Sequence, residues 1–530
     1  MGNKKLQVWL PLILAGMIIA GMYIGYELHS NPGKGFFNTS KSNALQETVD
    51  LIRLRYVDSV HLDSLEGEAI EQMVNQLDPH SVYIPAVSLK EANEDLAGNF
   101  EGIGVEFNVF SDTVNVLYVI EGGPSEKAGL QIGDKILKVG NTILTYKNLD
   151  SDDVKRIIRG KRGTTIDLEI LRNNKIMIVP VTRGTIPVSS IDAAYMIDRS
   201  IGYIRLNKFS ESSYEEFMQS LERLQKEGLQ KLILDIRSNG GGFMNEAVDI
   251  ADEFLDNDKL IVYTSGTNNP RREYRSKRNG LFETGKLVVL VDELSASASE
   301  VLAGALQDWE RATIIGRRTF GKGLVQEQYT LSDGSAIRLT VARYYTPSGR
   351  SIQRSYEKGR KVYMDDLWER FSSGELIHVD STKIINGNVY ETLGKEKRKV
   401  YGGGGIMPDI FVPFDTTTYQ RNINRLFANG TFNRFVYQYY LRNKSSLSQY
   451  SSATDYAVRF NKDNELWQRL KEYIPKDSID LGKVSQDDKE SLQKRLKALL
   501  ARFRWRNDGF YHVLNTEDAV VLKAIEILAK

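Results

Sequence analysis

Hydrophobic positions change their spacing along the chain, and these changes divide it into segments. An uncharged apolar run from Val8 to Tyr26 follows two lysines, and as a helix it reaches roughly 28 Å. The run predicts a transmembrane anchor over residues 8–28. Because positive residues precede it, we expect residues 1–7 in the cytoplasm and the rest of this single-pass chain outside, on the periplasmic side of the inner membrane in a Gram-negative bacterium.

The next three segments differ in their hydrophobic period. Residues 29–43 are rich in glycine, asparagine and serine and are typical of a linker. Residues 44–97 have helical apolar spacing, which predicts a helical region interrupted at Pro79. Residues 98–185 contain short β-rich runs separated by glycine turns, which predicts a compact α+β domain.

A larger segment, residues 186–414, repeats one pattern three times. An apolar strand leads into a turn of small residues, and in the first two cases a helix follows the turn. If these strands are parallel, their turns meet at the carboxyl edge of one sheet. That edge collects a glycine, a serine and a lysine: Gly241, Ser297 and Lys322.

The remaining segments are less informative. A charged insertion covers about residues 356–401, and residues 415–530 are expected to be mainly helical. Within the latter, residues 491–506 place leucines and Phe503 on one face and basic residues elsewhere, which predicts a docked helix with a solvated basic face. The alternative is that this basic face contacts anionic lipids, an adaptor or another copy of the chain.

Composition narrows the function. The formal net charge of +1 gives no reason to expect nucleic acid as a partner, and the absence of cysteine excludes thiol chemistry and disulfides. None of the five histidines lies between residues 231 and 326, which disfavours a Ser-His-Asp triad there. We expect no metal site and no cofactor.

A serine and a lysine at one sheet edge suit nucleophilic catalysis. A lysine whose pKa is lowered by burial can take the proton of a serine hydroxyl. The backbone N–H groups of Gly241 and Ala298 lie at adjacent turns and are candidate oxyanion donors. Taken singly, Ser297 and Glu300 are also explained as a helix capping box, and Lys322 as a solvated loop residue.

The segment at 98–185 resembles a bacterial PDZ domain. Its Gly102-Ile103-Gly104-Val105 loop precedes a Gly-Gly-Pro-Ser turn and a Gly-Asp-Lys-Ile strand start in the order that such domains have. The loop is expected to turn successive backbone N–H groups towards the terminal carboxylate of a peptide that adds as a strand.

The catalytic segment resembles the carboxy-terminal processing peptidases, also called tail-specific proteases. The resemblance rests on the blocks at 291–300 and 319–326 and on shorter motifs at 77–81, 344–353 and 405–410. It implies a crotonase-like α/β core with an inserted PDZ domain. It further implies the nucleophile Ser297, the general base Lys322, the orienting residue Gln326, the oxyanion donors Gly241 and Ala298, and the supporting residue Asp308.

The family resemblance therefore predicts a serine endopeptidase that captures the free C-terminal ends of protein substrates. The alternative is a non-catalytic PDZ scaffold of the cell envelope. One departure concerns Gly240, which stands where the family commonly has proline, and which is expected to loosen the oxyanion turn until substrate or the PDZ domain engages.

Overall fold

A computed structural model of the protein describes residues 11, 14–23, 26, 44–145, 149–378, 388–415, 421–428, 430–474 and 480–530. The chain divides into two compact units, Met1–Met73 and Val74–Lys530. The first unit contains helix α2 (Ala44–Arg55), which is mostly exposed, and most of α3 (Leu62–Asn75), whose side chains are exposed or half-buried apart from the buried Val74. All elements that bear on the site belong to the second unit.

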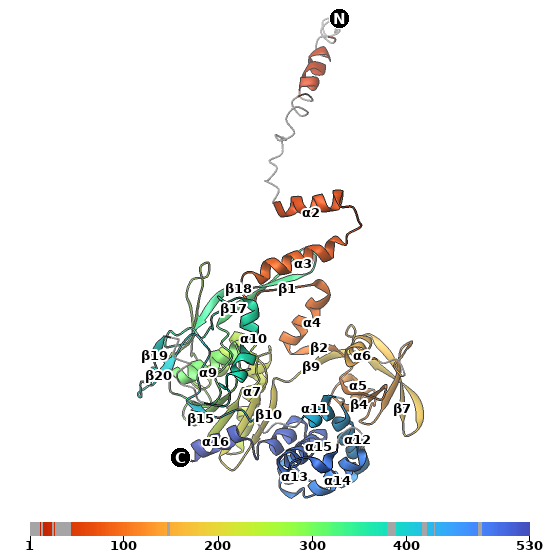
Figure 1. The fold of residues 1–530 in the computed structure, drawn as a ribbon, viewed down its shortest axis with the longest axis vertical. Coiled ribbons are helices and arrows are strands. Elements are labelled where there is room, and N and C mark those ends of the chain that lie inside the picture. Colours follow the sequence, from red (N-terminus) through yellow and green to blue (C-terminus); the bar gives the residue numbers. More distant parts are fainter. Residues whose placement is uncertain are drawn as a thin grey trace, which may run out of the picture. The chain divides into compact units, whose positions relative to one another are not determined.

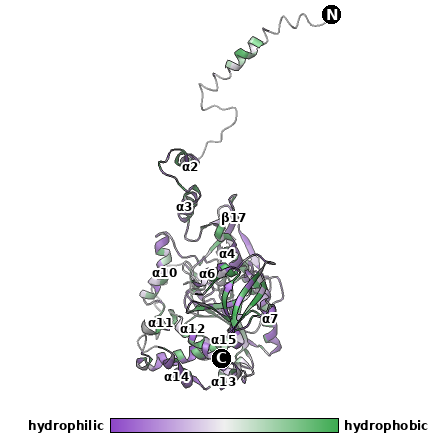
Figure 2. Cartoon of the chain, turned by 90° about the vertical axis from the view of Figure 1, so that its right-hand side faces the viewer, coloured by the Kyte–Doolittle hydropathy of each residue, from purple (hydrophilic) through white to green (hydrophobic). Residues whose placement is uncertain are grey.

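The expected membrane anchor is covered only in part. Residues 11, 14–23 and 26 are helical, and Figure 2 colours the described segment mostly as hydrophobic. Residues 8–10, 12, 13, 24, 25, 27 and 28 of the expected anchor, residues 1–7 and the expected linker at 29–43 lie outside the described residues. No helix in the described part of the chain has the length and apolar character needed to cross a membrane.

The central sheet of the second unit has six strands in the order β10-β11-β12-β15-β16-β21. Figure 1 labels two of them, β10 and β15, with the C-terminal helix α16 (Ala519–Ala529) beside β15. All neighbours are parallel except the β10–β11 pair. The three strands expected from the sequence are thus parallel neighbours, as predicted. The strands are β10 (Ile191–Met196), β11 (Ile201–Leu206), β12 (Lys231–Asp235), β15 (Lys286–Val291), β16 (Thr313–Gly316) and β21 (Ile410–Phe411).

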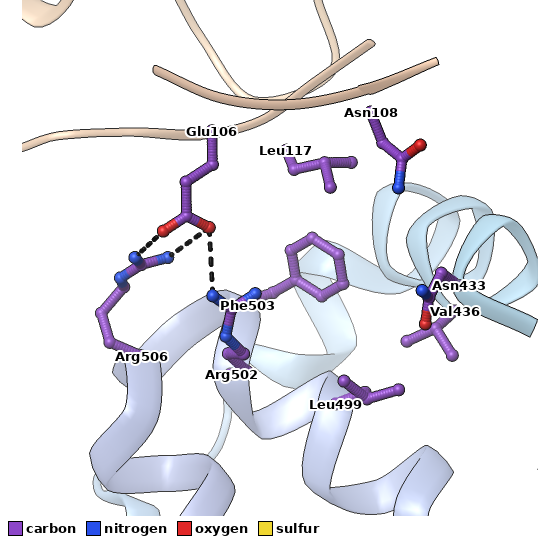
Figure 3. Close-up of a pocket in the computed structure, with 9 residues that line it drawn as sticks. All are labelled: Glu106, Asn108, Leu117, Asn433, Val436, Leu499, Arg502, Phe503 and Arg506. Atoms are coloured by element: carbon purple, nitrogen blue, oxygen red, sulfur yellow. Dashed lines mark hydrogen bonds and ion pairs between the residues drawn. The ribbon is translucent and has the colours of Figure 1, made fainter. Parts of the chain in front are cut away.

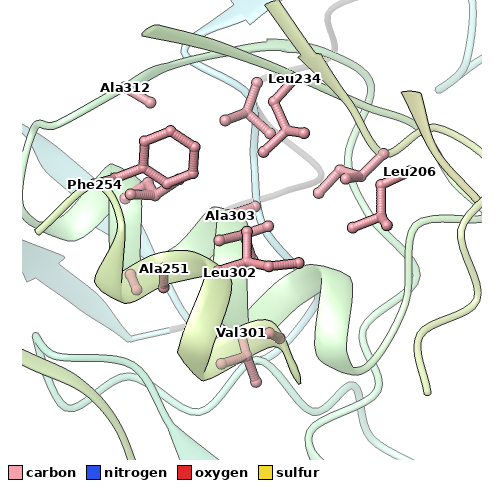
Figure 4. Close-up of a cluster of buried hydrophobic side chains, with 14 of the residues drawn as sticks. Leu206, Leu234, Ala251, Phe254, Val301, Leu302, Ala303 and Ala312 are labelled. Atoms are coloured by element: carbon pink, nitrogen blue, oxygen red, sulfur yellow. The ribbon is translucent and has the colours of Figure 1, made fainter. Parts of the chain in front are cut away.

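Helices cover both faces of this sheet because successive side chains of a strand point to opposite faces. Leu232 and Leu234 of β12 pack with α7 (Ser213–Lys226), α8 (Met244–Asp252) and α9 (Ala298–Asp308). Figure 4 shows this cluster, with Leu234 and Leu206 above Leu302 and Val301 of α9. Ile233 lies in a separate cluster with the C-terminal helix α16 (Ala519–Ala529).

A second sheet lies in the order β1-β18-β13-β14, with β17 also paired to β18. It interrupts the simple repeat expected from the sequence, because β13 and β14 come between α8 and β15. The β17 strand begins two residues after Lys322, so this sheet fixes the lysine loop. The strands are β1 (Val82–Ile84), β13 (Leu260–Ser265), β14 (Arg272–Arg275), β17 (Leu324–Thr330) and β18 (Ala336–Tyr345).

Ahead of this core, α4 (Ala86–Ala97) leads into the β-rich segment. Its main sheet has the order β3-β4-β5-β7-β8, with β6 paired to β5, and β2 and β9 form a separate pair. Helix α5 (Pro124–Lys127) and helix α6 (Ser151–Ile158) complete it. The strands are β2 (Asn99–Gly102), β3 (Val105–Phe110), β4 (Thr113–Val119), β5 (Lys135–Val139), β6 (Thr142–Ile143), β7 (Thr165–Arg172), β8 (Lys175–Thr182) and β9 (Gly184–Pro187).

The insertion within the core segment contains helix α10 (Arg360–Ser372) and the hairpin β19 (Val389–Glu391) to β20 (Lys399–Tyr401). Residues 379–387 of the insertion lie outside the described residues. Helices then dominate to the C-terminus, as expected. They are α11 (Arg421–Ala428), α12 (Thr431–Leu447), α13 (Ala453–Arg459), α14 (Asp463–Tyr473), the 3-10 turn η1 (Leu481–Lys483), α15 (Gln486–Leu514) and α16.

Helix α15 corrects one expectation. Leu492, Leu496 and Leu500 are buried as the spacing predicted. The predicted solvated basic face holds only in part: Arg495 and Arg504 are exposed, whereas Lys497 donates to the carbonyl oxygens of Ala457 and Phe460. The helix also kinks at Trp505 and Arg506, whose backbone angles are not helical.

Candidate active site

Ser297 occupies a sharp turn between β15 and α9. Its φ of 57° and ψ of −114° are unusual for a residue with a side chain. The turn holds the half-buried serine between the buried Ala296 and Ala298. Its positive φ makes this a strained turn directly ahead of the first residue of α9.

A buried carboxylate ties this turn to the lysine loop. Glu300 Oε2 accepts hydrogen bonds from the backbone N–H of Ser297 at 2.9 Å and from that of Lys322 at 2.8 Å. Its other oxygen accepts from the Gly321 N–H and the Thr319 hydroxyl. Because both N–H groups bond to the same oxygen, the backbone nitrogens of Ser297 and Lys322 lie close together. Their separation is at most the sum of the two hydrogen-bond lengths.

Glu300 is thus more than the helix cap that its spacing suggested. Burial raises the pKa of its carboxyl to about 7, although the hydrogen bonds from Thr319, Lys322, Gly321 and Ser297 act in the opposite direction. The sequence placed Glu300 in a capping box but gave no sign that it also binds the loop of Lys322, because the two segments meet only in the folded chain.

The Lys322 side chain points to Gln326. Its Nζ donates to Gln326 Oε1 at 2.9 Å, and Gln326 Nε2 donates to the backbone oxygen of His80. The contact with His80 fixes which end of the amide faces the lysine. Among the described residues, Lys322 Nζ makes no hydrogen bond to Ser297 Oγ.

The electrostatic surroundings favour a neutral lysine. Burial lowers the pKa of the Lys322 ammonium, and the charge of Arg338 lowers it further, while the carboxylates of Glu300 and Asp78 partly oppose this effect. A lysine with a lowered pKa retains an unprotonated amine at a lower pH than a solvated lysine does.

The loop at 78–81 contributes to the site, a contribution that the spacing argument did not reveal. Asp78 Oδ1 accepts from the backbone N–H groups of His80 and Ser81 and so holds the carbonyl of His80 towards Gln326. Burial lowers the pKa of the His80 imidazole to about 4, and the charge of Lys322 adds to this effect. The fold thus brings a histidine near the lysine, but His80 Nε2 is hydrogen-bonded to the Tyr363 hydroxyl at 2.7 Å.

Tyr344 is a further residue of the site to which the sequence assigned no role. Its hydroxyl donates to the backbone oxygen of Lys322. Burial raises the pKa of this phenol well above its usual value, whereas the adjacent Ser297 side chain lowers it. Tyr344 therefore stays neutral and links the serine turn to the lysine loop from the β18 side.

The two expected oxyanion donors differ in their surroundings. Ala298 is the first residue of α9, a position whose N–H has no partner within the helix. The Gly241 N–H instead donates to Asn239 Oδ1 at 2.9 Å. A Cβ atom on Gly241 would lie 2.8 Å from Ser297 Cβ and 3.0 Å from the Ala298 nitrogen, so the glycine turn lies directly against the nucleophile turn.

The glycine turn is well connected, in contrast to the looseness expected from Gly240. The Phe209 N–H donates to the Gly241 oxygen at 3.0 Å, and the buried Asn239 accepts from Ala296 N–H and from the Ser299 hydroxyl. Gly242 lies so close to Phe209 that a Cβ atom would come within 2.1 Å of its backbone oxygen. These contacts give no sign that the turn is loosened by Gly240.

Asp308 lies away from this group. It forms an ion pair with Arg350 at 2.8 Å, with both side chains fully buried, and it accepts from the Ser348 N–H. As the last residue of α9 it is about 16 Å along the helix from Ser297. The fold gives it a structural contact near the insertion rather than a place beside the serine or the lysine.

The Gly102–Val105 loop opens into a groove. A cavity of about 400 Å³ is lined by this loop, by β3 and by α6. Ile103 is buried and Gly104 has a φ of 76°, which suits glycine. Strand β3 is an edge strand, paired only with β4 in the described sheet, so its other edge is available to a peptide strand.

No group of three or more histidine, aspartate or glutamate side chains that suits a metal ion occurs in the described part of the chain. The chemistry that this arrangement supports is nucleophilic attack by a serine, with a lysine as base.

Comparison with known proteins identifies a peptidase family and a PDZ domain in the chain. The model of peptidase family S41 matches residues 200–359, and that of the PDZ domain matches residues 102–182. A third model, described only as a family of unknown function, matches residues 422–506.

Curated relatives cover most of the chain. A probable CtpA-like serine protease of Staphylococcus epidermidis is 32% identical over 357 residues, which cover 66% of this chain and 72% of the relative. The carboxy-terminal processing protease CtpA of Bacillus subtilis is 33% identical over 317 residues, or 59% of this chain and 67% of that protein. Among solved structures, the photosystem II D1 C-terminal processing protease is 31% identical with a TM-score of 0.35, covering 58% of this chain and 83% of that chain.

Proposed function

Because the chain belongs to the S41 peptidases, as a CtpA-like carboxy-terminal processing serine protease with a PDZ domain, we propose that Ser297 is its nucleophile and Lys322 its general base. The observation that carries this proposal is the pair of backbone hydrogen bonds from Ser297 and Lys322 to one oxygen of Glu300. Since the chain belongs to a family of proteases, we do not assign it the alternative function of a non-catalytic PDZ scaffold.

In the proposed mechanism, neutral Lys322 removes the Ser297 hydroxyl proton as the serine oxygen attacks the scissile carbonyl. Gln326 accepts one N–H of the amine, which leaves the nitrogen lone pair free to face the serine. The resulting ammonium donates its proton to the leaving amine, and an acyl-serine ester remains. Lys322 then deprotonates a water that hydrolyses the ester, and the proton returns to the Ser297 oxygen.

The oxyanion of each tetrahedral intermediate is assigned to the Ala298 N–H and the Gly241 N–H. The first has no partner within α9, because it belongs to the first residue of the helix. The second must exchange the Asn239 oxygen for the oxyanion, so the Gly241 donor becomes available as substrate enters. Lys322 Nζ keeps its hydrogen bond to Gln326 and comes within reach of the Ser297 hydroxyl as substrate enters, since catalytic hydrogen bonds often tighten only when substrate binds.

PDZ domains bind C-terminal peptides, and we assign capture of the substrate carboxylate to the backbone of the Gly102–Val105 loop. The cavity beside this loop and the open edge of β3 support the assignment. The tail adds as a strand alongside β3, and the adjoining unfolded segment reaches Ser297. The crotonase-like class of the core is likewise an assignment, supported by the parallel sheet with helices on both faces.

A peptide with a free C-terminal carboxylate should bind the full-length Ser297→Ala protein at least about tenfold more tightly than the same peptide with a C-terminal amide, since a charged acceptor strengthens the hydrogen bonds from the loop. Fluorescence anisotropy with both peptides measures the difference. A replacement that blocks the loop, Gly104→Val, should remove it, because Gly104 has a positive φ and a Cβ atom there would lie 3.1 Å from Ile186. Equal affinities for acid and amide would refute capture of the carboxylate.

We also propose that the apolar residues 8–28 tether the enzyme to a membrane. The uncharged run after two lysines and the helical state of residues 14–23 support this part of the proposal. Deleting residues 1–28 should move the protein from the membrane pellet to the supernatant after cell lysis and ultracentrifugation, with unchanged hydrolysis of a soluble unfolded protein. A full-length chain already recovered in the supernatant would contradict the tether.

A further inference from the structure

The tail-binding groove has a second wall that a PDZ domain alone does not supply. The cavity beside the Gly102–Val105 loop is also lined by Arg502 of α15. A second cavity of about 190 Å³ lies between β3 and β4 on one side and α12 and α15 on the other. The two cavities share Glu106, Leu117 and Arg502, so the groove along β3 continues beneath the C-terminal helices.

The C-terminal helices hold this wall in place through direct contacts with the PDZ sheet. Figure 3 shows Glu106 on the strand facing Arg506 and Arg502 on α15, with Phe503 turned into the space between strand and helix. The Arg506 guanidinium also lies 3.5 Å from the centre of the Tyr118 ring. The Tyr437 hydroxyl of α12 donates to the Val116 oxygen, and Arg434 donates to Ser111.

Charge at this wall is unbalanced in favour of cations. Arg506 and Arg502 both bind Glu106, the latter at 3.2 Å. Burial alone would raise the pKa of Glu106, but the hydrogen bond from Arg506 and the charge of Arg502 outweigh it and hold the pKa below its usual value. One carboxylate therefore faces two guanidinium groups, and one positive charge is left without a local counterion among these three side chains.

The geometry of strand addition says which substrate residue meets this charge. The carboxylate-binding loop lies at the start of β3, so a captured tail runs antiparallel to β3 and its last residue lies beside Val105. Side chains of β3 alternate, with Val105 and Phe107 packed on the PDZ core and Glu106 and Asn108 on the opposite face, towards α12 and α15. Opposite residues of an antiparallel pair point to the same face, so the penultimate side chain lies with Glu106.

We propose that α15 forms part of the tail-binding site and that Arg502 selects protein tails whose penultimate residue is aspartate or glutamate. Arg502 is the cation that lines both cavities, and its guanidinium is only partly engaged: Nε donates to Asn507 and Nη2 to Glu106. The incoming carboxylate binds Arg502 while Glu106 keeps Arg506. This inference rests on the proposed capture of tails by the PDZ loop.

The test uses two peptides that differ only in a penultimate Glu or Gln, bound to the full-length Ser297→Ala chain and measured by fluorescence anisotropy. The Glu peptide should bind about tenfold more tightly at low salt, because a new charge-assisted hydrogen bond to a partly exposed arginine is worth about a factor of ten. Adding Arg502→Gln should remove the preference and leave the affinity for the Gln peptide unchanged, whereas Arg502→Lys, which keeps the charge, should retain part of it.

Arg434→Gln is the matched control, because Arg434 joins the same helices to the PDZ sheet through Ser111 but does not line either cavity. It should leave the preference intact. Equal binding of the two peptides, or a preference that survives Arg502→Gln, would overturn the role of Arg502. Loss of discrimination between free-acid and amidated peptides would instead refute tail capture itself, so the two failures are distinguishable.

Discussion

Replacing Ser297 with alanine is expected to reduce hydrolysis of an unfolded protein by at least about 10⁴-fold, the loss typical of enzymes deprived of their nucleophile. Ser297 lies in a strained turn at the start of α9, and Glu300 joins this turn to the Lys322 loop. The rate of fragment appearance on a gel, with a reduced and carboxymethylated protein as substrate, measures the loss.

Alanine at this position should not disturb the fold, because the Ser297 contact to Glu300 is made by the backbone N–H and remains in the variant. Binding of a free-acid peptide should therefore survive in Ser297→Ala. The matched control is Ser189→Ala, an exposed serine ahead of β10 that should retain full activity. Undiminished hydrolysis by purified Ser297→Ala would show that another residue is the nucleophile.

Replacing Lys322 with alanine is expected to lower the rate of hydrolysis by about 10³-fold, within the range that general base catalysis contributes. The pH profile provides a sharper test. The base must be neutral, so activity should rise with pH through the pKa of Lys322. Because burial and Arg338 lower that pKa, the rise should occur below the value of about 10.4 for a solvated lysine. The residual activity of Lys322→Ala should lack this rise.

A substitution at Arg338 tests what lowers the pKa of Lys322 and leaves Ser297 unchanged. Its charge lowers the pKa of Lys322, so Arg338→Gln should move the rising limb to higher pH while the plateau rate stays the same. Arg338 lies on β18, where its guanidinium donates to Gln328, a contact on the outer part of the sheet. A limb that stays in place, or one that moves to lower pH, would show that a different group controls the profile.

Glu300 illustrates how local and long-range information divide between sequence and structure. Its spacing from Ser297 identifies a helix start, because capping depends only on neighbours along the chain. Its hydrogen bonds to Thr319, Gly321 and Lys322 require that β16 return beside β15, and that proximity exists only in the assembled sheet.

The same division holds for Gln326. The family resemblance gave it the role of orienting the lysine, and its amide does contact Lys322 Nζ. What fixes the amide is the backbone oxygen of His80, which lies 246 positions away in the chain. Every residue has a backbone oxygen, whatever its side chain, so no sequence pattern predicts that contact. Asp308 shows the reverse case, since the family resemblance implied a supporting role for it whereas the fold pairs it with Arg350.

The sequence by itself predicted three strand-and-turn units of the core, and the family resemblance identified the PDZ-type loop and the candidate serine and lysine. The units follow from hydrophobic period and from glycine and small-residue turns, which act over a few residues. Their parallel arrangement was a condition that the sequence left open and the structure met. Only the tertiary structure decided that Glu300 joins the two catalytic turns, that Gly241 is held by Asn239, and that Arg502 reaches the PDZ groove. Those contacts join segments that are distant in the sequence. Which of the many polar side chains come into contact is decided only when these segments pack together.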